Sequence, residues 1–403
     1  MAETYAYKVR DRRGALLTGE IQADNRDLVL ARLREMEYIP LEVKSKSKGM
    51  KKEIRLRPAR VKLKHLAVFS RQFATMVNSG LPLLRTLAIL GEQTESKELA
   101  RIVGEIRLDV ERGASLSDAM EKYPRAFDEL YVAMVRAGEV SGNLDQVLLR
   151  VADTIEKEVT LRQKIKSAMT YPTVVFGLVV IILSVILIFV VPTFKDLYAQ
   201  LGGTLPGPTR LLIAISDIVR RFFLVVVGLN ILGIWAFRRW IKTEKGRYLF
   251  DRFKLKLPIF GPLFRKTALS RFARTLGTLS RSGVPILQAL DIVQDTVKNS
   301  VVARAVKDVQ ASVKEGESLT KPLARHPVFP PMVVQMMAVG EETGALDTML
   351  EKISDFYDEE IAATVESLTS LIEPVLIAVV GGAVGAIVIA LYLPTFRIFE
   401  LIE

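Results

Sequence analysis

The sequence contains no cysteine and only two histidines, His65 and His326. The absence of thiols excludes disulfides, thiolate zinc sites, iron–sulfur ligation and a cysteine nucleophile. Two histidines this far apart also argue against a histidine-rich metal centre. Walker A, GxGxxG, HExxH, GxSxG and EF-hand patterns are missing as well. We therefore expect no catalytic residues, no cofactor and no metal ion, and predict that the protein is not an enzyme.

The amino terminus lacks the apolar stretch of a signal peptide. The first ten residues contain no run of apolar side chains, and they are followed by the charged residues Asp11, Arg12 and Arg13. Membrane insertion would have to depend on internal segments. Half of the residues are hydrophobic and the mean hydropathy is +0.26, although 25% of the residues are charged. This combination indicates that apolar residues are concentrated in a few segments and charges in others, as in an integral membrane protein.

Two segments, 173–191 and 375–393, each contain nineteen residues without a charge. At a rise of about 1.5 Å per residue each is about 28 Å long, close to the roughly 30 Å of a hydrocarbon core. A third, weaker segment begins at Phe222 and ends with Trp235 and Trp240 near one side, as in an interfacial aromatic belt. We expect three transmembrane helices, at residues 171–192, 222–241 and 374–394.

The flanking charges predict the orientation of these spans. Lysine and arginine are concentrated before the first span, at 150–166, and after the second, at 238–247. Because basic residues favour the cytoplasmic side, the amino terminus and the region 242–374 are expected in the cytoplasm. The loop 193–221 and the tail 395–403 are then extracytoplasmic.

An internal repeat organises the rest of the chain. Asn78–Pro82 recurs as Arg281–Pro285, 203 residues later, and Gly138–Asp145 recurs as Gly340–Asp347, 202 residues later. The register continues through the apolar segment that follows each copy. This pattern predicts two homologous helical modules, at 65–170 and 268–373, each joined to a membrane helix.

Each module is predicted to be an antiparallel bundle of six helices, because apolar residues recur at helical spacing between glycine and proline breaks. In the first copy the helices are expected at 62–78, 82–93, 97–111, 116–122, 128–138 and 144–169, with Ser115 placed to cap the fourth. The fold class is thus mainly α.

Twelve residues define the turns of the modules. They are Gly80, Pro82, Gly113, Gly138, Glu139 and Gly142 in the first copy and Gly283, Pro285, Gly316, Gly340, Glu341 and Gly344 in the second. We interpret all twelve as structural or interface positions. Glu139 and Glu341 are the only repeated acids that suggest catalysis, and one carboxylate at a turn between helices is more often a cap or a hydrogen-bonding group.

Four residues mark the points where the chain enters the membrane: Tyr171 and Pro172 in the first copy, and Glu373 and Pro374 in the second. Glu373 is expected at a helix amino terminus, where the dipole favours a carboxylate. In the last span Gly381 and Gly385 form a GxxxG pattern, which predicts close helix packing within or between chains.

The amino-terminal residues differ from both modules. Residues 1–43 are predicted to form a small α/β lobe with strands at 5–9 and 16–21 and a helix at 26–36. A linker, 44–64, follows with ten Lys and Arg against Glu53 alone. It is compatible with anionic lipid, with an acidic partner or with a solvated tether. Nucleic acid is disfavoured, because no aromatic residues are interleaved with the charges.

Together these segments resemble a known family. SGLPLLRTL, RGASLSDAM and AGEVSGNLD in the first module are followed by SGVPILQAL, EGESLTKPL and VGEETGALD in the second, and EPVLIAVVGGAVG begins the last span. The chain resembles, over essentially its whole length, the inner-membrane platform proteins of type II secretion and type IV pilus systems (GspF/PilC-like).

The resemblance implies a protein of the inner membrane that is not an enzyme and forms a homo-oligomer. It implies contact with a cytoplasmic hexameric ATPase, with pilin or pseudopilin subunits, with other inner-membrane components and with membrane lipid. The ATPase would drive insertion or extraction of pilin subunits. The main alternative is a subunit of a transporter or channel, which would require ionisable residues or broken helices near the midplane. Asn230 is the only internal polar candidate.

Overall fold

The computed structural model describes residues 3–10, 16–23, 26–36, 38–45, 61–200 and 206–402. The chain divides into two compact units, Met1–Ala59 and Arg60–Glu403, which are described separately. Residues 46–60, the larger part of the linker expected at 44–64, lie outside the described residues.

The amino-terminal unit is a three-stranded antiparallel sheet with one helix. Its elements are β1 (Glu3–Arg10), β2 (Leu16–Ala23), α1 (Arg26–Glu35) and β3 (Ile39–Ser45). The strand order is β2-β1-β3, so the first strand is central. Tyr5 and Val9 alternate toward one face, where they form a core with Val29 and Leu33 of the helix.

The first module contains the helices expected from the sequence, with boundaries shifted by at most a few residues except at its last helix. They are α2 (Leu63–Asn78), α3 (Leu83–Gln93), α4 (Lys97–Glu111), α5 (Leu116–Glu121), α6 (Glu129–Ser141) and α7 (Leu144–Val185). The predicted cap of the fourth helix is confirmed, because the backbone N–H of Asp118 donates to the Ser115 hydroxyl at 3.1 Å.

The second module repeats this order. Its helices are α12 (Gly261–Arg281), α13 (Ile286–Thr296), α14 (Ser300–Lys314), α15 (Thr320–Ala324), α16 (Pro331–Thr343) and α17 (Leu346–Ile402). Helix α12 begins seven residues before 268, where the module was expected to start. A further helix, α11 (Glu244–Lys256), precedes it and lies outside every domain expected from the sequence.

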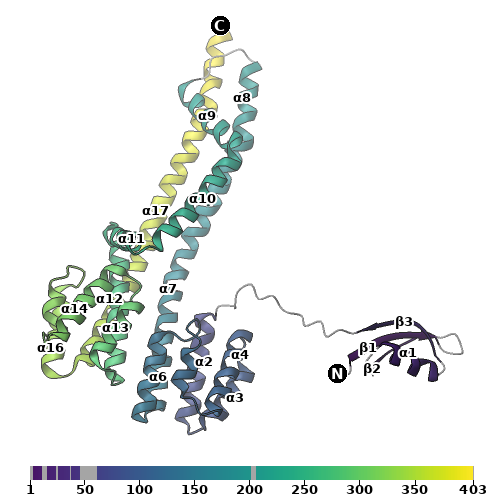
Figure 1. Cartoon of the computed structure of the whole chain (residues 1–403). Coiled ribbons are helices and arrows are strands. Elements are labelled where there is room, and N and C mark those ends of the chain that lie inside the picture. Colours follow the sequence, from purple (N-terminus) through teal and green to yellow (C-terminus); the bar gives the residue numbers. More distant parts are fainter. Residues whose placement is uncertain are drawn as a thin grey trace. The chain divides into compact units, whose positions relative to one another are not determined.

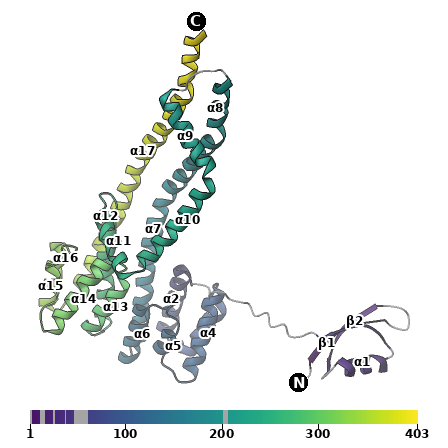
Figure 2. The same ribbon diagram turned by 45° about the horizontal axis from the view of Figure 1, so that its top comes forward.

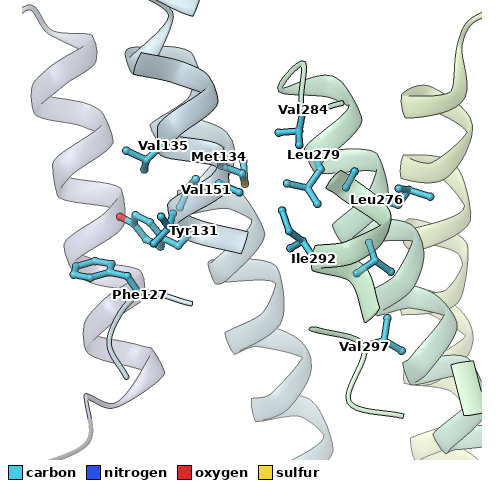
Figure 3. Close-up of a cluster of buried hydrophobic side chains, with 14 of the residues drawn as sticks. Phe127, Tyr131, Met134, Val135, Val151, Leu276, Leu279, Val284, Ile292 and Val297 are labelled. Carbon is cyan, nitrogen blue, oxygen red and sulfur yellow. The ribbon is translucent and has the colours of Figure 1, made fainter. Parts of the chain in front are cut away.

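The two modules share one hydrophobic core. Met134 of α6 points toward Leu279 of α12 and Ile292 of α13 (Figure 3), and all three belong to a single cluster of buried apolar residues that extends through both copies. Within the first module Phe127 and Tyr131 meet edge to face, with ring centroids 4.9 Å apart. The two modules are therefore fixed against each other and do not form separate domains.

The last helix of each module continues without a break into the apolar segment that follows it. Helix α7 is 42 residues long and α17 is 57 residues long, and each contains an internal proline, Pro172 or Pro374. The two helices leave the modules side by side (Figures 1 and 2). Their most apolar stretches are almost entirely exposed, which suits contact with lipid rather than a protein core.

The segment 193–221, expected as a loop, is mostly helical. After a π-helical turn, η1 (Ile186–Val190), the chain forms α8 (Val191–Gln200) and then α9 (Gly207–Arg221). Helix α9 is held against α17 and η1, because Thr209 donates to the Ala390 carbonyl at 2.6 Å and Ser216 donates to the Leu187 carbonyl. Pro208 stands in the first turn of α9, where proline is tolerated. Helix α10 (Phe223–Ile241) then returns toward the modules (Figure 1).

Candidate functional site between the two modules

Six of the repeated turn residues are glycines with positive φ. Their φ angles are +81° at Gly80, +96° at Gly113 and +71° at Gly142, and +78° at Gly283, +90° at Gly316 and +70° at Gly344. This left-handed conformation is costly for residues with a Cβ atom. The three turns of the first module thus return in the second with the same backbone conformation.

Glu139 and Glu341 bind the amino terminus of the short helix in their own module. Glu139 accepts from the backbone N–H groups of Leu116 and Ser117 at 2.5 and 3.0 Å. Glu341 accepts from the N–H of Leu319 at 2.8 Å and from the Thr320 hydroxyl at 3.2 Å. Each carboxylate therefore satisfies donors that a helix leaves unpaired in its first turn.

The glycine before each of these acids lies where two helices approach closely. A Cβ atom added at Gly138 would lie 3.0 Å from Cβ of Val147, and one at Gly340 would lie 2.9 Å from Cα of Leu346. Pro82 and Pro285 stand immediately before α3 and α13, at the N-cap position. Each pair thus occupies the same place in both copies.

The four residues expected at the membrane boundary lie inside continuous helices. Tyr171 and Pro172 are within α7, and Glu373 and Pro374 are within α17. The expectation that Glu373 stands at a helix amino terminus was therefore wrong, because α17 begins at Leu346. The dipole argument does not apply to this carboxylate.

The GxxxG pattern of the last span makes no close contact with another segment among the described residues. Cβ atoms added at Gly381 or Gly385 would meet no atom within 4 Å. Close packing within the chain is therefore not observed at these two positions, and packing between chains stays a prediction.

Charged residues of α7 connect the first module to the second. Arg271 of α12 contacts Glu158 at 3.1 Å, and Lys157 contacts Asp355 of α17 at 2.8 Å. Arg150 donates to the backbone carbonyl of Arg281 at 2.7 Å. These contacts lie between the two copies of the repeat.

Glu158 is the centre of this network. Burial opposes its ionisation, but the nearby cations Arg271, Arg162 and Lys298 outweigh burial and lower the pKa of the carboxyl. Burial lowers the pKa of Arg271 against the opposing effect of Glu158, and the neighbouring Arg162 and Arg274 lower it further. Lys298 is the one non-glycine residue with positive φ among the described residues, at +55°.

A cleft of about 440 Å³ lies between α7, α12 and α17. Its acidic and basic side chains pair with each other: Arg281 contacts Asp347 and Glu351 at 3.1 and 2.5 Å, and Arg274 contacts Asp358. Because most of these charges are compensated within the protein, the cleft has no strong preference for an ion of one sign.

No group of three or more His, Asp or Glu side chains with the spacing of a metal site occurs among the described residues. His65 lies 3.7 Å from Glu95 and His326 lies 3.4 Å from Asp308, each at the surface of its own module. Sequence reasoning identified the turns but missed the contacts between modules, since helical periodicity does not reveal which helices meet.

A duplicated helical module, each copy continuous with a long apolar helix, defines a membrane protein built from an internal repeat. Comparison with known families agrees with this class. The family described as "Type II secretion system (T2SS), protein F" matches residues 69–192 and 272–394, which are the two modules with their apolar segments. The family described as its N-terminal domain matches residues 1–44. The chain belongs to the type II secretion system protein F family.

Curated relatives cover nearly the whole chain. It is 47% identical over 398 residues to the type IV pilus assembly protein PilC of Thermus thermophilus, covering 98% of each chain. It is 41% identical over 400 residues to the PilC of Myxococcus xanthus, covering 99% of this chain and 96% of the relative. It is 35% identical over 409 residues to the type II secretion system protein F of Vibrio cholerae, covering 99% of each.

Proposed function

We propose that this protein is the inner-membrane assembly platform of a type IV pilus or type II secretion machine. In this role it couples a cytoplasmic hexameric ATPase to the insertion or extraction of pilin or pseudopilin subunits. The relatives named for pilus assembly and for secretion support the proposal. It is a mechanical rather than a catalytic function.

The observation that carries this proposal is the continuity of α7 and α17. Helix α17 begins inside its module and runs past the end of its apolar segment, and α7 runs from its module well into its apolar segment, as far as Val185, before the π-helical turn η1. A continuous helix is stiff over its length, so a displacement or rotation of a module is transmitted to the membrane segment. The shared core of the two modules makes both helices respond together.

The proposed topology has three spans. The third is α10, whose 19 residues extend about 28 Å at 1.5 Å per residue, enough for one crossing. Leu229, Ile231 and Trp235 on this helix are exposed, as expected for side chains facing lipid. With three crossings and the basic residues on the cytoplasmic side, we propose that both modules are cytoplasmic and that the carboxyl terminus is outside.

A transporter or channel subunit is the alternative. It would require charged or interrupted helices at the membrane midplane. The interruption in the described part of this region is a π-helical turn. The Leu187 carbonyl in that turn accepts a hydrogen bond from the Ser216 hydroxyl. That turn packs against apolar residues of α9, α8 and α17, which supports the platform over a transport site at this position.

Cysteine accessibility tests the topology, since the chain has no native cysteine. Single cysteines would replace Ser47, Thr204, Thr320 and Glu403. In intact cells the first and third should be protected from an impermeant reagent and the other two labelled. Labelling at Thr320 from outside would place the modules in different compartments and contradict a platform beside a cytoplasmic ATPase.

Insertions after Thr170 test the mechanical coupling. Seven alanines keep α7 helical and nearly preserve its rotational phase, because seven residues make about two turns. Seven glycines of the same length make the connection flexible. We expect the glycine insertion to abolish pilus assembly or secretion while membrane insertion persists, and the alanine insertion to retain much more activity. Equal activity of the two variants would contradict transmission through α7.

A further inference from the structure

Helix α11 is fixed to the second module along one face. Asp251 accepts from the Ser300 N–H at 2.9 Å and from its hydroxyl at 2.7 Å, which holds α11 against the start of α14. Lys254 contacts the same carboxylate at 2.7 Å. Phe250 meets Phe237 of α10 edge to face, with centroids 5.3 Å apart. The orientation of the helix about its axis is therefore set by buried contacts.

The opposite face of α11 is exposed and mixes basic with large apolar residues. Lys245, Leu249, Arg252, Phe253 and Lys256 are all exposed and follow each other at intervals of four, three, one and three residues. This spacing places them in one stripe along the helix. Leu249 and Phe253 remain 53% and 59% exposed. We call these five residues the α11 stripe.

Exposed apolar residues continue beside the stripe. Ile259, just after α11, is 51% exposed and Phe264 at the start of α12 is 38% exposed. Between 238 and 256 the chain carries eight Lys and Arg against Glu244 and Asp251. Since Asp251 is buried and paired, the exposed surface is strongly basic.

The position of α11 brings this surface to the edge of the membrane. Only Lys242 and Thr243 separate it from α10, which ends with Arg238, Arg239 and Trp240. Figure 1 shows α11 at the end of the second module from which α10 and α17 leave it. A helix at this height with cationic and aromatic side chains on one face matches the composition of interfacial membrane helices.

We propose that the α11 stripe lies on the anionic cytoplasmic leaflet, with Leu249 and Phe253 inserted at the headgroup level and Lys245, Arg252 and Lys256 among lipid phosphates. The inference rests on the proposed function only in taking α10 as a span that ends in the cytoplasm. Lipid is favoured over a protein partner because basic and apolar residues alternate along the whole stripe and continue directly from a membrane helix.

This contact would hold the second module at a defined height and tilt against the bilayer. Because α11 is bonded to α14 through Asp251 and Ser300, the module could not rotate freely about the axis of α17. Because the two modules share one core, the stripe would thus anchor both of them at the bilayer surface.

Fluorescence in reconstituted full-length protein tests the contact. The environment-sensitive dye NBD is attached at Phe253→Cys in nanodiscs of phosphatidylcholine alone or mixed with phosphatidylglycerol. Some of the lipid carries a doxyl quencher high on its acyl chain. The control, Glu315→Cys, lies fifteen residues beyond Ser300 at the other end of α14, about 22 Å away at 1.5 Å per residue.

We expect a blue-shifted emission and strong doxyl quenching at position 253 in discs with phosphatidylglycerol, and neither at position 315. Adding the triple substitution Lys245→Gln, Arg252→Gln, Lys256→Gln to the protein labelled at position 253 should remove most of the blue shift and quenching. The labelled protein without the triple substitution should show the same loss in discs of phosphatidylcholine alone. These substitutions are at exposed positions, so the fold is retained.

Two results would overturn the proposal. In the first, position 253 is quenched by aqueous iodide and not by doxyl lipid in either disc. In the second, it is protected from both quenchers, which would mean that protein, such as a second copy of the chain, covers the stripe. Neither ATPase nor pilin is present in the discs, so these results are independent of the outcome of the cell-based tests of the platform.

Discussion

Glu139 and Glu341 occupy the same position in the two copies of the repeat, and each binds the amino terminus of a short helix that lies 22 or 23 residues earlier in the chain. The short helices α5 and α15 have only 6 and 5 residues, too few to be stable by themselves. Glu139 therefore connects the end of α6 to α5, and Glu341 connects the end of α16 to α15. Each short helix depends on this contact for its stability.

Replacement of Glu139 by alanine should loosen α5. The N–H groups of Leu116 and Ser117 lose their acceptor, at a cost of about 1–3 kcal/mol. Hydrogen exchange read by mass spectrometry should show faster exchange of these amides, with a smaller effect in Glu139→Gln, which keeps one acceptor oxygen. Glu111→Gln is the control, since that carboxylate is exposed and lies 3.7 Å from Arg107. Unchanged exchange in Glu139→Ala would contradict the assigned role.

The glycines of the repeat should differ in their response to alanine. Gly142→Ala forces a Cβ atom into a φ of +71°, at a cost of about 1–2 kcal/mol. Gly138→Ala should also destabilise, through the 3.0 Å approach to Val147. Gly104→Ala is the control, because it lies inside α4 with open space around it, and should stabilise by about 0.5–1 kcal/mol. The melting temperature in detergent measures the effect of all three substitutions. Gly344→Ala and Gly340→Ala in the second module should destabilise in the same way as Gly142→Ala and Gly138→Ala.

These turns were accessible to sequence reasoning because the repeat shows each position twice. A glycine that returns at the end of an apolar-periodic segment indicates a requirement of the backbone, and the structure shows it as a positive φ at Gly80 and Gly283. The helices between these glycines could then be predicted from the spacing of apolar residues, with small errors in the positions of their ends. Local periodicity was sufficient for this part of the fold.

The long helices could not be predicted by the same reasoning. Pro172 and Pro374 are helix breakers in water, so a boundary was expected at each, yet α7 and α17 continue through them. Within a membrane segment a helix has no favourable alternative for its backbone groups, which makes an internal proline tolerable. The contact of Glu158 with Arg271 was missed for another reason: 113 residues separate them, and no local pattern reports such a pairing.

The GxxxG face of α17 should act between chains. Gly381→Val or Gly385→Val places a larger side chain where no atom of the described part of the chain lies within 4 Å of the added Cβ, so the monomer should fold and insert normally. Crosslinking in membranes should show fewer oligomers if small residues allow the close approach. Gly228→Val in α10, which is equally open, is the control. Oligomers that persist in both variants would exclude this face as the interface.

Asp251 should stabilise the attachment of α11 most strongly at neutral pH. Burial would raise its pKa, but hydrogen bonds from Lys254 and Ser300 lower it below the ordinary 3.8. The folded state thus favours the ionised form, so its contribution is present above pH 3.8 and is lost as the pH falls through the lower folded pKa. Asp251→Ala should cost about 1.5–3 kcal/mol near neutral pH.

Exchange of the α11 amides in Asp251→Ala measures this effect, with Asp291→Ala, on the surface of α13, as the control. The difference from wild type should be constant near neutral pH and should shrink only in strong acid. A difference that grows as the pH falls below 3.8 would have the wrong sign for a carboxylate whose pKa is lowered in the folded state.

The two ion pairs between the modules should differ in strength. The side chains of Glu158 and Arg271 are 26% and 23% exposed, whereas those of Lys157 and Asp355 are 44–45% exposed. A double-mutant cycle on the first pair should give a coupling of about 1–3 kcal/mol, since Arg271→Ala leaves a half-buried carboxylate with fewer cations. The exposed pair should give about 0–1 kcal/mol, reduced further by salt.

The pH dependence of the first pair gives a second test with a definite sign. Because Arg271, Arg162 and Lys298 lower the pKa of Glu158 against burial, its contribution is present above the ordinary value of 4.5 and disappears as the pH falls through the lower folded value. Glu158→Gln should remove that acid-side loss, whereas Lys157→Gln should leave it unchanged. If both variants retain the wild-type pH profile, the ionisation of Glu158 does not link the modules, and their alignment depends on the shared core around Met134, Leu279 and Ile292 and on the remaining contacts between them.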